Sequence, residues 1–196
     1  MSSSPFTLIL AGGEGRRMGG GKPARLLGDE RLIDRAVALA RRWDDAPAVA
    51  LHSCRDNGTP NARVLQDRLD LEGPLAGLAV GVEFAVREGA ERLLLIPADM
   101  PFLPEDLPER LGEGLGSEMG CAMASSGGHR HPVCSLWRLN RLASELPHYC
   151  ASGRRSLMGL AEAVGAIEIE WPTEKRDPFF NINDERDLAA AEAMLD

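Results

Sequence analysis

The sequence predicts an α/β fold in three layers, with a mostly parallel central sheet and helices on both of its faces. Short apolar runs alternate along the chain with segments whose apolar residues recur at helical spacing, as in strand–helix–strand units. The run at 92–97 (RLLLIP) has four consecutive large apolar residues, which indicates a strand that is buried on both faces.

The first half of the chain predicts four strands and two helices. Residues 7–10 (TLIL) are apolar, include a β-branched residue and come before a glycine-rich segment, so we expect a buried strand. A helix is expected over 32–42, because its apolar residues recur at helical spacing, and another over 74–87, which begins with a proline. The other strands of this half are expected at 48–51, 63–65 and 92–97.

The second half predicts further helices and strands in alternation. The expected helices are at 104–111, 139–146, 156–164 and 185–195, and the last is rich in alanine, with Asp184 as its N-cap. Extended segments are expected at 120–124, 132–136 and 167–170.

Length and composition favour one domain. The chain has 196 residues, of which 44% are hydrophobic, which is enough to form a full core. We predict a single domain over 1–196, with a nucleotide half of about 1–111 and an acceptor-side half of about 112–196. The glycine-rich stretch at 112–116 (GEGLG) is the loosest part of the sequence and marks the change between them.

Charge and composition exclude several classes of partner. The net charge of −8 argues against binding to nucleic acid or to an anionic membrane, and 5% aromatic residues argue against base stacking. No apolar run reaches 18 residues, and residues 1–6 lack the pattern of a secretory signal, so we expect a cytoplasmic protein. The four cysteines lack C-x-x-C spacing and are expected to be reduced thiols.

A cationic, glycine-rich segment directly follows the first expected strand. Between Gly12 and Gly28 the chain carries four cations and one acid, a formal charge of +3 within a chain of −8. Glycines allow backbone N–H groups to approach phosphate oxygens, and Arg17 and Lys22 would neutralise a triphosphate. Because ligands of open α/β sheets bind beyond the carboxyl ends of the strands, the segment predicts a polyphosphate site. The alternative is a flexible, solvated turn.

Two familiar phosphate loops do not fit this segment. A Walker loop requires Ser or Thr after the lysine, but Pro23 follows Lys22. A dinucleotide fingerprint requires a third glycine where the chain has Met18. A nucleotidyltransferase loop remains.

A carboxylate follows the central strand at the same predicted edge. Asp99 lies in "LLLIPADMPFLPEDL", where Pro97, Pro101 and Pro104 stiffen the turn. We expect Asp99 to bind Mg²⁺, which prefers oxygen ligands and keeps substrate phosphates in its shell. A helix cap is the alternative, although Glu105 and Asp106 lie nearer the following helix.

Five segments occur in an order and spacing typical of one family. "LAGGEGRRMGGGK", "LEGPLAGL", "PADMPFLP", "HRHPVCSLW" and "FFNINDERDL" resemble those of the molybdenum cofactor guanylyltransferases, from about Leu8 to Leu188. The resemblance implies a Rossmann-like nucleotidyltransferase fold and Mg²⁺-dependent transfer of GMP from GTP to the phosphate of molybdopterin, with release of pyrophosphate. The implied partners are GTP and molybdopterin, together with apo-molybdoenzymes or other cofactor-biosynthesis proteins.

The resemblance also assigns roles to single residues. Lys22 matches a lysine on the phosphates, Asp67 an acid near the nucleoside, and Asp99 the magnesium ligand. Asn183 is also expected near the metal or a phosphate. The segment that surrounds guanine and phosphates corresponds to Leu10, Ala11, Gly12 and Gly13. Positions nearer the pterin correspond to His131, Arg154, Arg155, Asn181 and Asn183.

The chain departs from the family pattern before Lys22 and after its second strand. The loop is one residue shorter, with Gly21 where the family commonly has an acid, and His52 stands where it often has Asn. Two further functions stay open: a nucleotidyltransferase that uses CTP or another phosphorylated acceptor, and a non-catalytic adaptor that binds nucleotide and cofactor. "SGRRSL" predicts either the start of a helix with solvated arginines or a site for the pterin phosphate.

Overall fold

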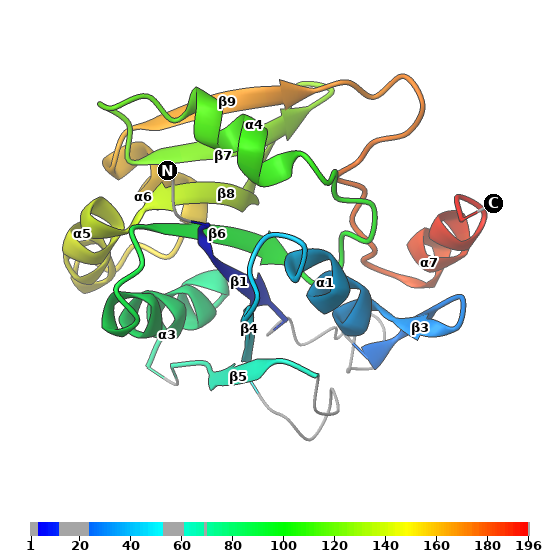
Figure 1. The fold of residues 1–196 in the computed structure, drawn as a ribbon, viewed down its shortest axis with the longest axis horizontal. Coiled ribbons are helices and arrows are strands. Elements are labelled where there is room, and N and C mark those ends of the chain that lie inside the picture. The colour runs from blue at the N-terminus through cyan, green and yellow to red at the C-terminus, as the bar shows by residue number, and fades with distance from the viewer. Residues whose placement is uncertain (1–3, 12–23, 53–60, 69, 196) are drawn as a thin grey trace.

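The centre of the molecule is a seven-stranded sheet. This computed structural model describes residues 4–11, 24–52, 61–68 and 70–195. From bottom to top of Figure 1 the strands lie in the order β5-β4-β1-β6-β8-β7-β9. Neighbouring strands are parallel except in the two pairs that involve β8, which confirms a mostly parallel sheet. The strands are β1 (Phe6–Leu10), β4 (Ala48–Leu51), β5 (Arg63–Gln66), β6 (Arg92–Pro97), β7 (Cys121–Ser126), β8 (His129–Arg138) and β9 (Ala166–Trp171).

Helices cover both faces of this sheet, as predicted (Figure 1). Side chains of neighbouring strand residues point to opposite faces, so Leu8 and Leu95 lie in one apolar core, whereas Ile9 and Leu94 lie in the other. The first core is closed by α3, α5 and α6, and the second by α1 and α4. The bounds of these helices are α1 (Leu32–Ala40), α3 (Pro74–Arg87), α4 (Leu107–Gly114), α5 (Leu139–Ala151) and α6 (Leu157–Ala163).

The strand directions place several carboxyl ends at one edge of the sheet. β1, β4, β5 and β6 are mutually parallel. β7 runs in the same direction as β6, because both are antiparallel to β8, and β9 is parallel to β7. Six strands therefore end at this edge, and β8 begins there.

Two glycines allow α3 to lie close to the sheet. A Cβ atom at Gly77 would lie 2.8 Å from Leu10 Cδ2 and 2.9 Å from the Cβ of Ala50, and one at Gly81 would clash with Leu8. Since real Cβ atoms avoid such contacts, any other residue at these positions would push the helix away from β1 and β4.

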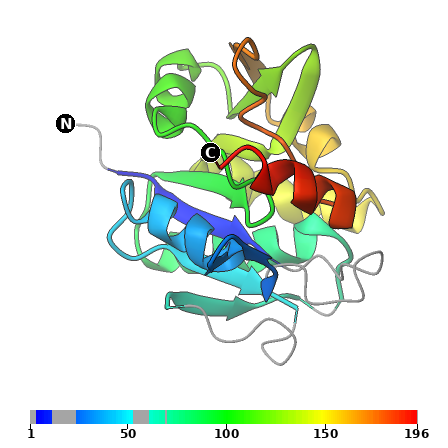
Figure 2. The same ribbon diagram turned by 90° about the vertical axis from the view of Figure 1, so that its right-hand side faces the viewer.

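A third, smaller core lies beyond the main sheet. Its buried residues are Leu27 of β2 (Leu26–Leu27), Leu32 of α1, Phe102, Ile182, and Ala191 of α7 (Glu185–Glu192). β2 pairs with β3 (Glu30–Arg31) in a two-stranded hairpin. Figure 2 shows α7 in red at the front of the molecule. This hairpin was not predicted, because strands of two residues are too short for a periodic pattern, although Gly28 at φ 62° supplies its turn.

Helix ends account for most differences from the expected elements. The helix expected at 104–111 is α4, Leu107–Gly114. The prediction of a loose stretch at 112–116 is therefore wrong for residues 112–114, which are helical. Gly114 provides close packing instead, because a Cβ there would clash with Ile169 of β9. α5 continues through Pro147 to Ala151, beyond the predicted end at 146.

The sheet runs through both predicted halves of the chain, and the division at about residue 111 stays a prediction. In the described ranges, every helix is too short or too polar to cross a membrane.

Candidate active site

The carboxyl edge of the four parallel strands is held by hydrogen bonds that continue past the strand ends. Ala11 N donates to Ala50 O at 3.0 Å, Asp67 N to Leu51 O at 3.0 Å, and Ala98 N to Leu10 O at 3.0 Å. The residue that follows β1, β5 or β6 is therefore fixed by its neighbouring strand. Side chains at these positions have a defined place although they lie in loops.

Asp67 is a buried carboxylate at the end of β5. Asp67 is 8% exposed. Its Oδ1 lies so close to Gly77 of α3 that a Cβ atom added to this glycine would be 3.2 Å from it. Within the described part of the chain, no donor lies within hydrogen-bonding distance of that oxygen. Burial raises the pKa of Asp67, and the charge of His52 at the end of β4 opposes this shift. The fold thus keeps a poorly solvated acceptor oxygen beside α3.

Asp99 follows β6 at the same edge. It is partly exposed, and its carbonyl accepts a hydrogen bond from Ile182 N at 3.0 Å. β5 and β6 are separated by β4 and β1, so three strand spacings of ~4.8 Å place the two strands about 14 Å apart. Asp67 and Asp99 therefore lie on either side of the carboxyl ends of β4 and β1.

The segment before α7 is hydrogen-bonded to the backbone of Asp99. Asn181 and Asn183 each lie one residue from Ile182, whose N–H binds the carbonyl of Asp99. Asn183 Nδ2 donates to Asn181 O at 3.4 Å, and its backbone N–H donates to Asp187 Oδ2. Asp184 caps α7 as predicted, accepting from two backbone N–H groups of the first turn.

His131 lies on β8 near the same edge, whereas Arg154 and Arg155 lie in the turn between α5 and α6. Arg154 packs over the ring of Tyr149 at 4.5 Å, and Arg155 donates to a backbone carbonyl of α5. Both arginines are exposed, and Ser156 caps α6. These contacts fit the helix-start interpretation of "SGRRSL", and the pterin role of the arginines stays a prediction.

Several predicted site residues lie outside the described residues: Gly12, Gly13, Arg17 and Lys22. Leu10 ends β1 and Ala11, which is 3% exposed, follows it, so the described part of the predicted nucleotide segment begins at the edge that holds Asp67 and Asp99. Among the described residues, no three His, Cys, Asp or Glu side chains form a cluster that could hold a metal ion.

Ser126 and Asp177 belong to this edge but were missed in the sequence. Ser126 Oγ contacts both His131 Nε2 and Asp177 Oδ1, each at 2.8 Å. The glycine pair after Ser126 signalled a turn, but single Ser and Asp residues give no pattern that identifies a partner 51 residues away.

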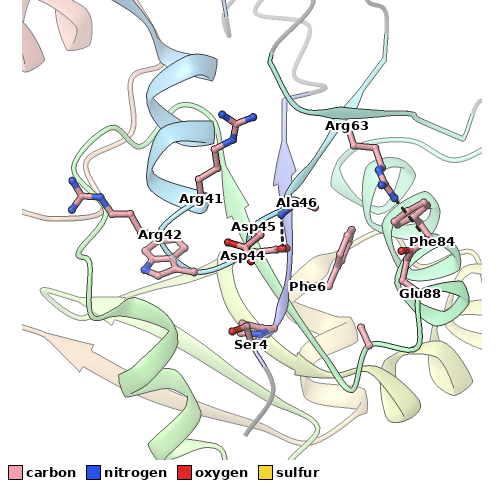
Figure 3. A pocket seen from close by; sticks show the side chains of 13 residues that line it. Ser4, Phe6, Arg41, Arg42, Asp44, Asp45, Ala46, Arg63, Phe84 and Glu88 are labelled. Carbon is pink, nitrogen blue, oxygen red and sulfur yellow. Dashed lines mark hydrogen bonds and ion pairs between the residues drawn. The ribbon is translucent and has the colours of Figure 1, made fainter.

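The opposite edge of the sheet also has a hollow, with a volume of ≈ 460 Å³ (Figure 3). Asp44 accepts from Thr7 N at 2.7 Å and from Ala46 N at 2.9 Å. Arg63 forms an ion pair with Glu88 at 3.8 Å and packs over the ring of Phe84. Asp44 is thus bound by backbone N–H groups and Glu88 by an arginine, which is typical of a solvated surface.

The family model of the MobA-like NTP transferase domain matches residues 7–166. The chain belongs to this family. It is 40% identical to a molybdenum cofactor guanylyltransferase of Cereibacter sphaeroides, over 97% of this chain and 96% of that one. It is 37% identical to the protein of the same name from a Bradyrhizobium species, with coverage of 99% and 96%.

Solved structures share the fold. Molybdopterin-guanine dinucleotide biosynthesis protein A of Archaeoglobus fulgidus aligns with a TM-score of 0.76 at 22% identity, over 97% of this chain and 98% of that one. A 2-C-methyl-D-erythritol 4-phosphate cytidylyltransferase of Thermus thermophilus aligns with a TM-score of 0.69 at 19% identity, over 98% of both chains. The three-layer architecture is therefore that of nucleotidyltransferases.

Proposed function

We propose that this protein transfers GMP from GTP to the phosphate of molybdopterin, forming molybdopterin guanine dinucleotide and pyrophosphate. The observation that carries the proposal is the shared strand edge. It places Asp67 and Asp99 on either side of β1, and β1 leads directly into the cationic glycine-rich segment. Relatives that are named guanylyltransferases and match nearly the whole chain support this substrate pair.

The reaction is a displacement at phosphorus. An oxygen of the molybdopterin phosphate forms a bond to the α-phosphorus of GTP, and the bond from that phosphorus to the bridging oxygen of pyrophosphate breaks. The attacking phosphate is already ionised at neutral pH, so no general base is needed. The protein contributes position and charge compensation. In this proposal Arg17 and Lys22 bind the leaving phosphates, and Asp67 accepts a hydrogen bond from the nucleoside.

Asp99 is proposed to hold Mg²⁺, with the side-chain oxygen of Asn183 as a second candidate ligand. The donors near Ile182 are carboxylate and amide oxygens, which suit a hard divalent cation. When bound, Mg²⁺ neutralises charge on the phosphates and orients them. The hydrogen bond from Ile182 N to the Asp99 carbonyl holds the backbone from which this side chain would reach the metal.

A panel of nucleotides tests the proposal. The purified protein is incubated with Mg²⁺, molybdopterin and GTP, CTP, ATP or UTP in turn, and pyrophosphate and dinucleotide are measured. We expect both products with GTP. Release with CTP alone would replace the guanylyl assignment by a cytidylyl one. Binding of GTP without turnover, and without an effect of Mg²⁺, would instead indicate a nucleotide-binding adaptor.

A further inference from the structure

A buried chain of hydrogen bonds lies at the part of the edge that β7 and β8 form. Ser126, the last residue of β7, is 1% exposed and contacts His131 Nε2 and Asp177 Oδ1 at 2.8 Å each. His131 is partly exposed. The segment that contains Asp177 comes from beyond β9, so three separate parts of the chain meet at one hydroxyl.

The number of hydrogens determines which tautomer His131 adopts. A serine hydroxyl has one hydrogen, and a carboxylate can only accept. The hydroxyl of Ser126 therefore donates to Asp177, and it can only accept from His131. The Nε2 atom of His131 must then carry a hydrogen. Burial lowers the pKa of His131, as does His129, while Asp177 and Glu170 oppose this change. In the neutral ring, Nδ1 has a lone pair and acts as a hydrogen-bond acceptor.

Packing fixes the plane of this ring. The ring of Phe179 stacks on that of His131 with centroids 4.7 Å apart and planes at 18°. Phe179 is itself held, because its N–H donates to Asp177 Oδ1 at 2.9 Å. The same carboxylate thus orders both the imidazole and the ring that covers one of its faces.

A bulge in β8 also sets the position of His131. Met123 pairs with Ser135, but the next residue, Ala124, pairs with His131, so residues 132–134 bulge from the ladder. Ser135 Oγ donates to Pro132 O at 2.7 Å across this bulge. Bulges of this kind redirect side chains near functional sites.

The bulge connects this cluster to Asp99. Cys134 Sγ lies 3.5 Å from Met100 Sδ, next to Asp99 in the sequence. Burial raises the pKa of the Cys134 thiol, and the charges of Asp99 and Asp177 raise it further. Both carboxylates therefore lie within electrostatic reach of one buried thiol. The hydrogen-bond chain lies on the side of β6 that faces away from β1 and β5.

We propose that His131 contacts the acceptor substrate and offers Nδ1 as a hydrogen-bond acceptor to an N–H or O–H group of its heterocycle, and that Ser126 and Asp177 are positioning residues that select this tautomer. This inference rests on the proposed function. A ring nitrogen with a lone pair repels phosphate oxygens, so it suits the amino or ring N–H groups of a nitrogen heterocycle. Specificity for the acceptor would then come from β7 and β8, separately from the nucleotide contacts.

Two substitutions at His131 distinguish the roles of its two ring nitrogens. In His131→Gln, the side-chain amide nitrogen can replace Nε2 and still bind Ser126, but the acceptor at Nδ1 is lost. In His131→Asn, the amide oxygen takes the approximate place of Nδ1. We expect His131→Gln to raise KM for molybdopterin about 3–10-fold, the effect of one lost hydrogen bond, and His131→Asn to retain more of the affinity. KM for GTP and kcat should change less than about 2-fold, within the scatter of a conservative change.

The matched control is His129→Gln. His129 lies two residues earlier on the same strand, is exposed and takes no part in the hydrogen bonds to Ser126. It should leave both KM values unchanged. If wild-type protein transfers GMP and His131→Gln keeps the wild-type KM for molybdopterin, this inference is wrong while the proposed function stands. If wild-type protein releases no pyrophosphate from GTP, the proposed function fails, and with it the acceptor assigned here.

A measurement that needs no turnover tests the tautomer. Nitrogen-15 NMR of the labelled protein at neutral pH should show a protonated Nε2 and an unprotonated Nδ1 for His131. Ser126→Ala and Asp177→Asn should shift the ring toward a mixture of tautomers, and addition of molybdopterin should move the Nδ1 resonance. A wild-type ring with hydrogen on Nδ1 would overturn the proposal, even if a variant failed to fold.

Discussion

The two edges of the central sheet carry similar side chains but use their charge differently. At the amino edge, carboxylates such as Asp44 and Glu88 are paired with backbone N–H groups or arginines (Figure 3). At the carboxyl edge, Asp67 is buried with an oxygen that no described donor reaches, and its pKa is raised. A carboxylate that the fold leaves poorly compensated is one whose partner can come from a ligand. We therefore expect ligand binding at the carboxyl edge, where the buried charge of Asp67 lowers the stability of the ligand-free protein.

The largest expected effect is at Asp99. Asp99→Ala should lower kcat by about 10²–10³, the loss for one preorganised electrostatic contact, while GTP affinity falls modestly. The hydrogen bond from Ile182 N is accepted by the backbone carbonyl of residue 99, so it should be retained in this variant. Steady-state kinetics over a range of Mg²⁺ concentrations measure this effect. The control is Glu105→Ala, which removes an exposed acid paired with Arg42 and should leave kcat unchanged. A wild-type kcat in the Asp99→Ala enzyme would contradict the proposal that Asp99 binds the metal.

A substitution of Asp67 should change nucleotide binding and protein stability in opposite directions. Asp67→Asn removes the negative charge, so KM for GTP should rise about 10-fold or more, because hydrogen bonds to charged groups contribute about 1.5–3 kcal/mol. The Tm of the ligand-free protein should instead rise by about 2–4 °C if the change recovers ~1 kcal/mol.

The pH dependence of that Tm difference has a definite sign. The pKa of Asp67 is raised in the folded chain above its ordinary value of 3.8, so folding favours the protonated form. This contribution to stability is full below pH 3.8 and is lost as the pH rises through the folded pKa. The Tm advantage of Asp67→Asn should therefore be present at pH 7 and shrink as the pH falls. A constant difference would show that burial of charge is not its cause.

Alanine substitutions at the two glycines of α3 should have smaller effects, and each serves as a control for the other. Gly77→Ala places a Cβ against Leu10, Ala50 and Asp67, and Gly81→Ala places one against Leu8, one turn farther from the carboxyl edge. Each should destabilise the protein by about 1–3 kcal/mol, as overpacking does. Thermal unfolding measures this loss. Only Gly77→Ala should also raise KM for GTP, because it displaces Asp67. Equal effects of both variants on KM would locate the nucleotide elsewhere.

The amino edge should give the smallest effect. Arg63→Ala removes an exposed ion pair with Glu88 and the contact with the Phe84 ring. The expected loss in the free energy of unfolding is about 0.5–1 kcal/mol, with unchanged KM and kcat. Chemical denaturation and steady-state kinetics test both parts. A raised KM for either substrate would show that the hollow at this edge takes part in binding.

The sequence predicted the fold well where burial produces a pattern. β6 was found from its continuous apolar run and α3 from its initial proline, each with the bounds that the structure has. Ends without such signals were misplaced: α5 continues past Pro147 because Tyr149 is still buried in the core. The hairpin of β2 and β3 was missed because strands of two residues have no period.

The site was predictable only in part, for a similar reason. Asp99 could be placed because it directly follows a recognisable strand, and parallel strand ends share an edge. The meeting of Ser126, His131 and Asp177 depends on the order of β7, β8 and β9 in the sheet and on a three-residue bulge, and no local sequence pattern encodes either. The predicted roles of Gly12, Gly13, Arg17 and Lys22 concern positions outside the described residues and stay predictions.

The bond from Ile182 N to the Asp99 carbonyl has a consequence for synthesis of the protein. β1, β4, β5 and β6 are complete once the chain has been synthesised through Pro97, so these four parallel strands can assemble early. The loop that carries Asp99 gains this backbone partner only when Ile182 emerges from the ribosome. A chain truncated before Ile182 would therefore contain the four parallel strands of this edge but would lack the backbone hydrogen bond that holds the loop of Asp99.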